Sequence, residues 1–133
     1  GEALVILNDK LKDGFRYIIK QHGGLLAKGR LLGLQFETLF TDNLYFDICK
    51  HAVEQAMQIR RAFEAKGVEM YTDSYTNQQF VIIEDHQMEK LAENFAFETW
   101  EKYDADHTVI RFCTSWATKD ENVQALVDAI AAL

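Results

Sequence analysis

The sequence lacks proline altogether, whereas proline makes up about 5% of ordinary proteins. It begins with Gly1 instead of methionine. We interpret these two absences as signs of a piece of a longer protein. No apolar run approaches the ~20 residues that a membrane span needs, and no signal or transit peptide is visible. We therefore expect no membrane partner and a cytoplasmic location.

Cysteine is scarce as well, with two residues, Cys49 and Cys113. They form no CxxC pair, and the 4 histidines show neither HxxxH nor HExxH spacing. The sequence therefore predicts no metal site. Each cysteine lies in an apolar pattern, which favours buried thiols in a reducing compartment.

Familiar catalytic motifs are also missing, since the chain has no GxSxG, no P-loop and no dinucleotide fingerprint. It has no internal repeat and no linker. Hydrophobic residues make up 48% and charged residues 26%, which excludes wholesale disorder. A length of 133 residues suits one domain, and we expect residues 1–133 to form it.

Charge is distributed unevenly along this chain of net charge -7. Residues 1–66 hold 10 Lys and Arg against 8 Asp and Glu, whereas residues 67–133 hold 4 against 13. Nucleic-acid binders need a broad positive surface, so we expect no nucleic-acid partner. The basic stretch over residues 10–30 suits a local site for a small anion, or a solvated helix face.

The first half has mainly helical periodicity. Residues 3–7 are an apolar run that predicts a buried strand. Helical patterns follow over residues 9–21, 25–40 and 44–66. Gly67 supplies a stop for the last helix. Within the second pattern, Gly29 and Gly33 stand four residues apart, a spacing that permits close approach of another backbone.

The second half changes to strand periodicity. Strand patterns cover residues 68–71, 79–83, 96–100 and 107–113, and helical patterns cover residues 85–94 and the C-terminal end. Thr118 and Glu121 match a capping box for the closing helix. This order predicts an α+β fold, with helices packed on one side of a small, mainly antiparallel sheet and a stray N-terminal strand.

A glycine-basic segment, Lys20 to Arg30, is the first feature that suits chemistry. We expect its paired glycines, Gly23 and Gly24, to open a helix whose free N–H groups, with lysine nearby, bind phosphate. A simple helix–helix turn with exposed basic residues is the alternative interpretation.

Arg111, within an apolar strand pattern, is the second such feature. Its guanidinium stays charged and needs partners for its donors, and its fork geometry suits a carboxylate. Strand alternation places Val109, Arg111 and Cys113 on one face and Ile110 and Phe112 on the other. A ligand carboxylate, an internal salt bridge and an edge position facing water all remain open.

Three segments in one order resemble a known family. They are Gly1-Glu-Ala-Leu-Val5, the Lys20–Arg30 segment, and Val109-Ile-Arg-Phe-Cys-Thr-Ser-Trp-Ala-Thr118. Together they are similar to the C-terminal part of the threonine aldolase and β-eliminating lyase family. These are pyridoxal-phosphate enzymes with the aspartate-aminotransferase-like fold, and the resemblance covers essentially the whole chain.

The resemblance implies roles for individual residues. Arg111 matches the arginine that binds the substrate α-carboxylate. Lys20, Lys28 and Arg30 are similar to contacts of the cofactor phosphate, with Lys28 favoured over Arg30. The family pattern is richer in glycine there and has an arginine soon after, whereas this chain has Leu25-Leu26-Ala27-Lys28.

The same resemblance implies that part of the enzyme lies outside this chain. The family's Schiff-base lysine lies just upstream of the segment that matches Gly1-Glu2, so we expect no catalytic residue here. Residues 1–7 would be a strand of the missing N-terminal, cofactor-binding domain. The intact protein would be a homo-oligomeric lyase that splits a β-hydroxy-α-amino acid into glycine and an aldehyde, and this chain alone would be inactive.

Two hypotheses from other classes stay open. One is a self-standing module in which the basic stretch and Arg111 form a single pocket for a small anion. The other is a dimerisation domain built on the Gly29 and Gly33 helix.

Overall fold

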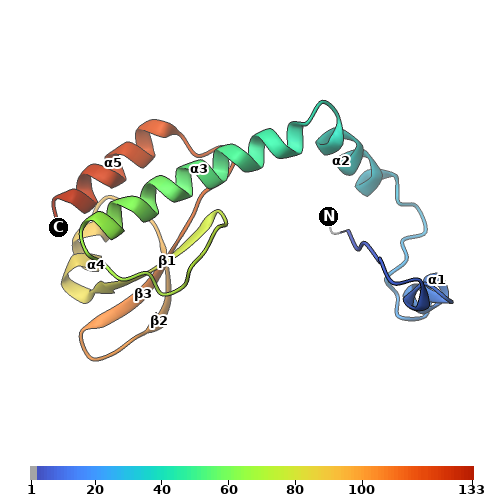
Figure 1. The fold of residues 1–133 in the computed structure, drawn as a ribbon, viewed down its shortest axis with the longest axis horizontal. Helices are drawn as coiled ribbons and strands as arrows, with labels where there is room; N and C mark the ends of the chain where they lie inside the picture. The colour runs from blue at the N-terminus through green and yellow to red at the C-terminus, as the bar shows by residue number, and fades with distance from the viewer. Residues whose placement is uncertain (1–2) are drawn as a thin grey trace. The chain divides into compact units, whose positions relative to one another are not determined.

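The computed structural model describes residues 3–133 (Figure 1). The chain divides into two compact units, Gly1–Tyr45 and Phe46–Leu133. Its elements in chain order are η1 Asp9–Leu11, α1 Phe15–Gln21, α2 Arg30–Phe40, α3 Leu44–Ala65, β1 Gln78–Glu84, α4 Asp85–Ala92, β2 Glu98–Lys102, β3 His107–Cys113 and α5 Asp120–Ala131. The α+β class is therefore confirmed.

A small antiparallel sheet organises the second unit, with the strand order β1-β3-β2. The predicted strands over 79–83 and 107–113 are present, and the one predicted over 96–100 lies two residues later. The strand predicted over 68–71 is reduced to a single bridge between Met70 and Val81, at the free edge of β1.

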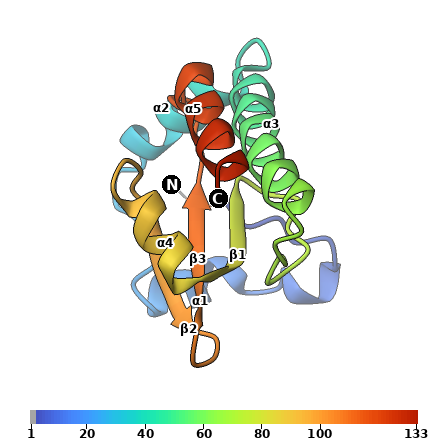
Figure 2. The same cartoon turned by 90° about the vertical axis from the view of Figure 1, so that its left-hand side faces the viewer.

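Helices cover one face of this sheet, as predicted (Figures 1 and 2). The core between the helices and the sheet consists of Ile59, Phe63, Val81, Ile83, Leu91, Ile110, Phe112, Val123, Leu126 and Ile130. Helices α3 and α5 lie side by side and run in the same direction. His51 bonds to the Thr118 carbonyl near one end, and Lys66 bonds to the Ala131 carbonyl near the other.

Helix α3 follows from its sequence pattern. Its buried apolar residues, Ala52, Ala56, Ile59 and Phe63, recur every three or four positions and so share one face. The helix ends in a Schellman motif, in which Gly67 N–H bonds to Glu64 O and Val68 N–H bonds to Phe63 O. Gly67 has a φ of 75°, a conformation that glycine adopts without strain, so the predicted stop is confirmed.

The start of α5 differs from the prediction. The residue before its first turn is Lys119, and no side chain caps the helix. The Thr118 hydroxyl instead accepts a 2.8 Å hydrogen bond from Ser115 N–H, closing the turn after β3. The predicted capping box is therefore wrong, because the turn uses the threonine oxygen that the box requires.

The first unit is more fragmented than predicted. The helix expected over residues 9–21 splits into η1 and α1, because Gly14 adopts the left-handed conformation at a φ of 65°. The helix expected from Leu25 begins only at Arg30. Residues 3–7 make no strand in this structure. Gly1 and Glu2, which complete the predicted N-terminal strand, lie outside the described residues.

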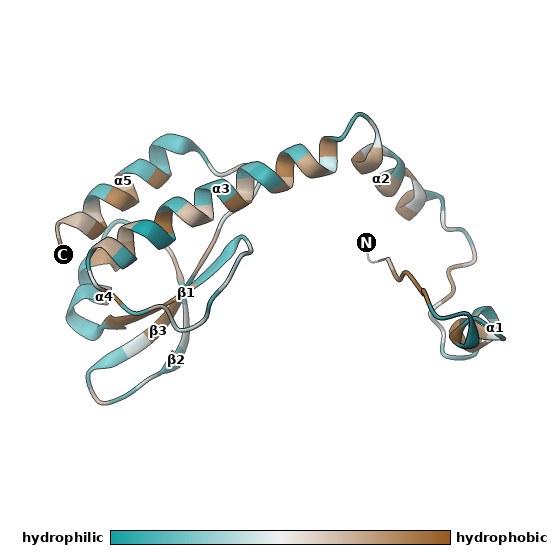
Figure 3. Ribbon diagram, in the orientation of Figure 1, coloured by the Kyte–Doolittle hydropathy of each residue, from teal (hydrophilic) through white to brown (hydrophobic). Residues whose placement is uncertain are grey.

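Apolar side chains of the first unit stay exposed. None of η1, α1 and α2 contains a buried residue. Figure 3 shows apolar residues along the segment before α1 and on α2. Leu7 is 88% exposed, and Gly29 and Gly33 have open space where a Cβ would stand. None of the described helices is long and apolar enough to cross a membrane.

Candidate functional site

Strand β3 carries the candidate site because its two faces differ chemically. Ile110 and Phe112 point into the core. Arg111 alternates with them and lies on the sheet face that the helices leave open, beside Phe80 of β1 and Glu98 of β2 in the strand register. The predicted alternation is therefore confirmed. Cys113 is exposed, so the expectation of two buried thiols is wrong.

Arg111 has few partners among the described residues. Its Nη1 donates a long, 3.4 Å hydrogen bond to Gln78 Oε1. Its Nε is buried and has no hydrogen-bond partner. No carboxylate of the described chain forms an ion pair with it, including Glu98 directly across the strand pair. A buried donor without a partner is costly, so this guanidinium suits a ligand that supplies an acceptor.

An aromatic pair lies beside the guanidinium. The Arg111 Cζ atom lies 5.3 Å from the centre of the Trp100 ring, within the range of a cation–π contact. The Phe80 and Trp100 rings pack edge to face, with 5.1 Å between their centres. The register of β2 shifts between Thr99 and Glu101, a bulge that leaves Trp100 as the extra residue. Glu101 also accepts a hydrogen bond from Tyr71, which raises the pKa of that phenol.

Lys20, Lys28 and Arg30 lie in the first unit, and all three are exposed. Lys20 belongs to the last turn of α1, whereas Lys28 and Arg30 flank Gly29 at the start of α2. None of the three forms an ion pair within the described part of the chain. Arg111 belongs to the second unit.

The paired glycines act differently from the prediction. Gly23 N–H bonds to Lys20 O, and Gly24 N–H bonds to Ile19 O. Both groups therefore close α1 in a Schellman arrangement and are not free at the start of a helix. The expectation that this pair opens a phosphate-binding helix is wrong. Helix α2 begins six residues later, with Gly29 at its N-cap and no side chain capping its first N–H groups.

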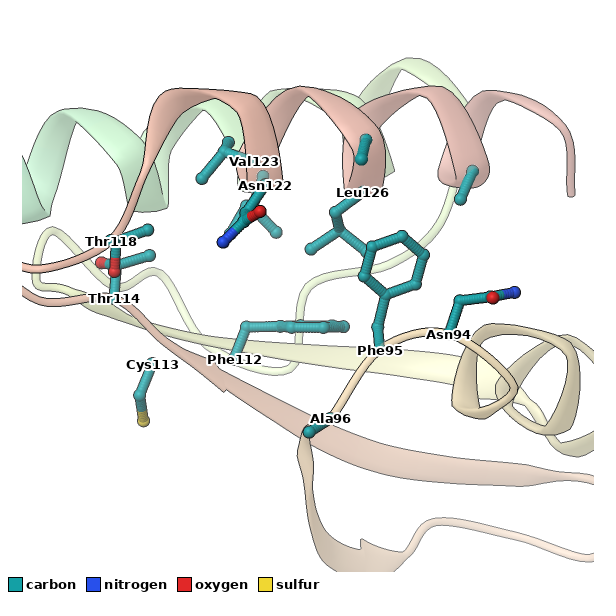
Figure 4. Close-up of a pocket in the computed structure, with 13 residues that line it drawn as sticks. Asn94, Phe95, Ala96, Phe112, Cys113, Thr114, Thr118, Asn122, Val123 and Leu126 are labelled. Carbon is teal, nitrogen blue, oxygen red and sulfur yellow. The ribbon is translucent and has the colours of Figure 1, made fainter.

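A groove of about 840 Å³ lies on the other face of the sheet, between α5, residues 94–96 and the end of β3. Figure 4 shows Phe95, Phe112 and Leu126 inside it, while the Cys113 sulfur turns toward the opposite side of the sheet. Its polar side chains are asparagines and threonines, without a charged group. Over residues 3–133, no three His, Cys, Asp or Glu residues are close enough together to hold a metal ion. Arg111 is therefore the better centre for a site.

Comparison with known proteins identifies relatives of the whole chain. No protein-family model matches it. The low specificity L-threonine aldolase of a Pseudomonas species (strain NCIMB 10558) is 29% identical over 139 residues, which span 100% of this chain and 38% of that protein. The threonine aldolase of Leishmania major matches in structure with a TM-score of 0.84 and 38% sequence identity, over 96% of this chain and 37% of that one. The chain is related to the threonine aldolases.

These relatives agree with the predicted resemblance. The α+β fold of the chain matches that of a threonine aldolase C-terminal domain. The 8-amino-7-oxononanoate synthase of Francisella tularensis has the same fold, with a TM-score of 0.60 over 91% of this chain at 15% identity. The chain spans somewhat more than a third of the length of each relative, at 37% and 38% of the two threonine aldolases.

The sequence predicted Arg111 but not its neighbours. The neighbours, Trp100, Phe80 and Gln78, lie on other strands, and all three are uncharged residues that the sequence gives no reason to connect with Arg111. The strand patterns held one clue, because alternation along each strand shows which residues share a face with Phe80 and with Trp100. Pairing those strands with β3 in the correct register would have placed both rings beside Arg111.

Proposed function

We propose that this chain is the C-terminal part of a pyridoxal-phosphate-dependent carbon–carbon lyase of the threonine aldolase type. The observation that supports it best is Arg111, a guanidinium with a buried, unpartnered Nε on the open sheet face. It lies in a chain that is 38% identical to the Leishmania threonine aldolase over 96% of its length. The substrate class is a β-hydroxy-α-amino acid such as L-threonine.

Arg111 binds and orients the substrate. A carboxylate accepts two parallel N–H bonds from a guanidinium, which fixes the direction of the amino acid as well as its position. Such orientation decides which bond at Cα breaks, because only one bond is aligned for cleavage at a time. In retro-aldol cleavage the Cα–Cβ bond breaks, its electron pair stays with Cα, the β-hydroxyl loses a proton and Cα gains one, so threonine yields glycine and acetaldehyde.

The basic residues of the first unit would bind the cofactor phosphate. Lys28 and Arg30 flank the uncapped start of α2, and Lys20 lies in α1. A phosphate dianion matches cationic side chains without carboxylate partners next to free helix N–H groups. When bound, pyridoxal phosphate supplies the electron sink for the cleavage. The attachment lysine and residues that pair with the segment 3–7 would come from the N-terminal domain, in a homo-oligomer.

The test uses the complete enzyme that contains this chain, purified with pyridoxal phosphate, and measures glycine formed from L-threonine. We expect Arg111→Ala to lower kcat/KM by about 10- to 1000-fold, since each charged hydrogen bond contributes ~1.5–3 kcal/mol. Arg61→Ala is the matched control, because Arg61 is an exposed arginine of α3. The 133-residue chain with added cofactor should form no glycine.

Two results would contradict the proposal. If Arg111→Ala kept the wild-type kcat/KM, this would contradict the role of Arg111 in binding the carboxylate. If the complete enzyme released no glycine from threonine or related β-hydroxy amino acids, this would contradict the proposed lyase activity itself.

A further inference from the structure

The contact between Trp100 and Arg111 is the feature that the proposed reaction leaves unexplained. The Trp100 side chain is half-exposed and its ring lies over the guanidinium, 5.3 Å from Cζ. Phe80 meets Trp100 at a ring distance of 5.1 Å and an interplanar angle of 78°. The ring lies beside the guanidinium and not in the core, so its contacts point to a role toward Arg111.

We propose that Trp100 is a positioning residue that holds the guanidinium of Arg111 in the orientation that receives the substrate carboxylate. This inference rests on the proposed function. A cation–π contact uses the face of the ring and takes up none of the guanidinium's N–H donors, so these donors stay available to a carboxylate. Gln78 engages Nη1 weakly, at 3.4 Å, while Nε keeps no partner.

An aromatic neighbour performs this task better than a carboxylate would. An ion pair with Glu or Asp would hold Arg111 equally firmly, but it would occupy the donors and neutralise the charge that the substrate needs. Glu98 lies directly opposite Arg111 in the strand register, yet it forms no ion pair with Arg111 in the described structure. Trp100 orients the cation and leaves it unpaired.

The strands explain how Trp100 reaches this position. The bulge between Thr99 and Glu101 inserts Trp100 as the extra residue of β2, and bulges commonly redirect a side chain. Phe80 is the partner of Arg111 in the β1–β3 register, and it contacts the Trp100 ring from β1, the strand on the opposite side of β3 from β2. The three side chains thus come from three neighbouring strands and meet on one face.

Kinetics of the complete enzyme test this role. Trp100→Leu should raise KM for L-threonine about tenfold, which corresponds to about 1.4 kcal/mol and matches the scale of one cation–π contact, while kcat changes less than threefold. Without the ring, Arg111 binds the carboxylate less tightly in the ground state and the transition state alike, but it still orients the substrate once that is bound, so the effect falls on KM. A purely structural loss would instead reduce the amount of active enzyme and leave KM unchanged.

Trp116→Leu is the matched control. It removes the chain's other tryptophan, which is 71% exposed in the turn after β3, and KM should stay at the wild-type value. Trp100→Phe should give a KM between those of wild type and Trp100→Leu, because phenylalanine binds cations less strongly than tryptophan. Equal KM values in all three variants and wild type would overturn the inference.

A second readout needs neither cofactor nor turnover. In the 15N-labelled chain, the Arg111 Nε–H proton should resonate upfield of the other arginine Nε–H protons, because the Arg111 guanidinium lies over the face of the Trp100 ring. Trp100→Leu should remove that displacement, while Trp116→Leu should preserve it. An unchanged Arg111 resonance in Trp100→Leu would show that the two side chains do not stack and would overturn the inference.

The two proposals can fail separately. If Arg111→Ala keeps wild-type kcat/KM, the carboxylate role fails, and the role of Trp100 fails with it. If Arg111→Ala loses activity while Trp100→Leu keeps the wild-type KM, only the role of Trp100 is overturned.

Discussion

The hydroxyl of Thr114 donates a 2.6 Å hydrogen bond to the backbone carbonyl oxygen of Ala52. Both residues are buried, and the bond ties the end of β3 to helix α3. Because Thr114 directly follows β3 and Arg111 lies three residues earlier, within β3, the contact also helps to fix the strand that presents the candidate site. Asn77 Nδ2 donates to Thr114 O at 2.7 Å and ties the same point to the start of β1.

Thr114→Val keeps the side-chain shape and removes the buried hydroxyl. We expect it to lower the free energy of unfolding by about 1 kcal/mol, the net contribution of one such hydrogen bond. Urea unfolding followed by circular dichroism measures the change. Thr99→Val is the control, because Thr99 is exposed and should change stability by less than ~0.5 kcal/mol. Equal losses in the two variants would contradict a specific role for the buried bond.

A chain shortened to residues 44–133 should fold cooperatively. All core residues, from Ile59 to Ile130, lie within it, and α3 keeps its full length from Leu44. The segment before residue 44 contributes no buried residue from η1, α1 or α2, so its removal costs little apolar burial. Thermal unfolding should give a Tm within a few degrees of that of the full chain. A shortened chain without a cooperative transition would show that the first unit is needed for the core.

Stability should depend on pH through His107 and Asp104. The Asp104 carboxylate lies 2.9 Å from His107 Nδ1, and this hydrogen bond raises the pKa of the imidazole above its ordinary value. The folded state therefore favours protonated His107. The stabilisation from this pair is complete below the pKa of about 6.5 that histidine has in the unfolded chain, and it is lost as pH rises through the higher pKa of His107 in the folded chain. As pH rises from about 6 to about 8, the Tm of wild type should fall further than the Tm of His107→Gln.

Asp104→Asn provides the control for this pH effect. It keeps a side-chain oxygen that can accept from the Asp106 and His107 N–H groups, which the carboxylate does now at 2.8 Å each. It removes the charge, so the pKa of His107 measured by NMR titration should fall toward the ordinary value. A His107 titration that is the same in wild type and Asp104→Asn would contradict the pairing.

Periodicity and stop signals determined much of the second unit. The apolar face of α3 and the glycine after it are local features, so the sequence alone placed that helix within about a residue. The alternation in residues 107–113 likewise put Arg111 on the face opposite Ile110 and Phe112 before any partner strand was known. These predictions succeeded because each depends on residues close together in the chain.

Competing local hydrogen bonds and contacts between distant segments decided the rest. Locally, Thr118 closes a turn with Ser115 instead of capping α5, and Gly23 and Gly24 close α1 instead of opening α2. The ring of Trp100 reaches Arg111 only through the register and bulge of β2. Sequence thus determined that this chain carries an arginine on the strand face opposite Ile110 and Phe112. Tertiary structure decided what surrounds it, since strand pairing and register join residues whose separation along the chain encodes no distance.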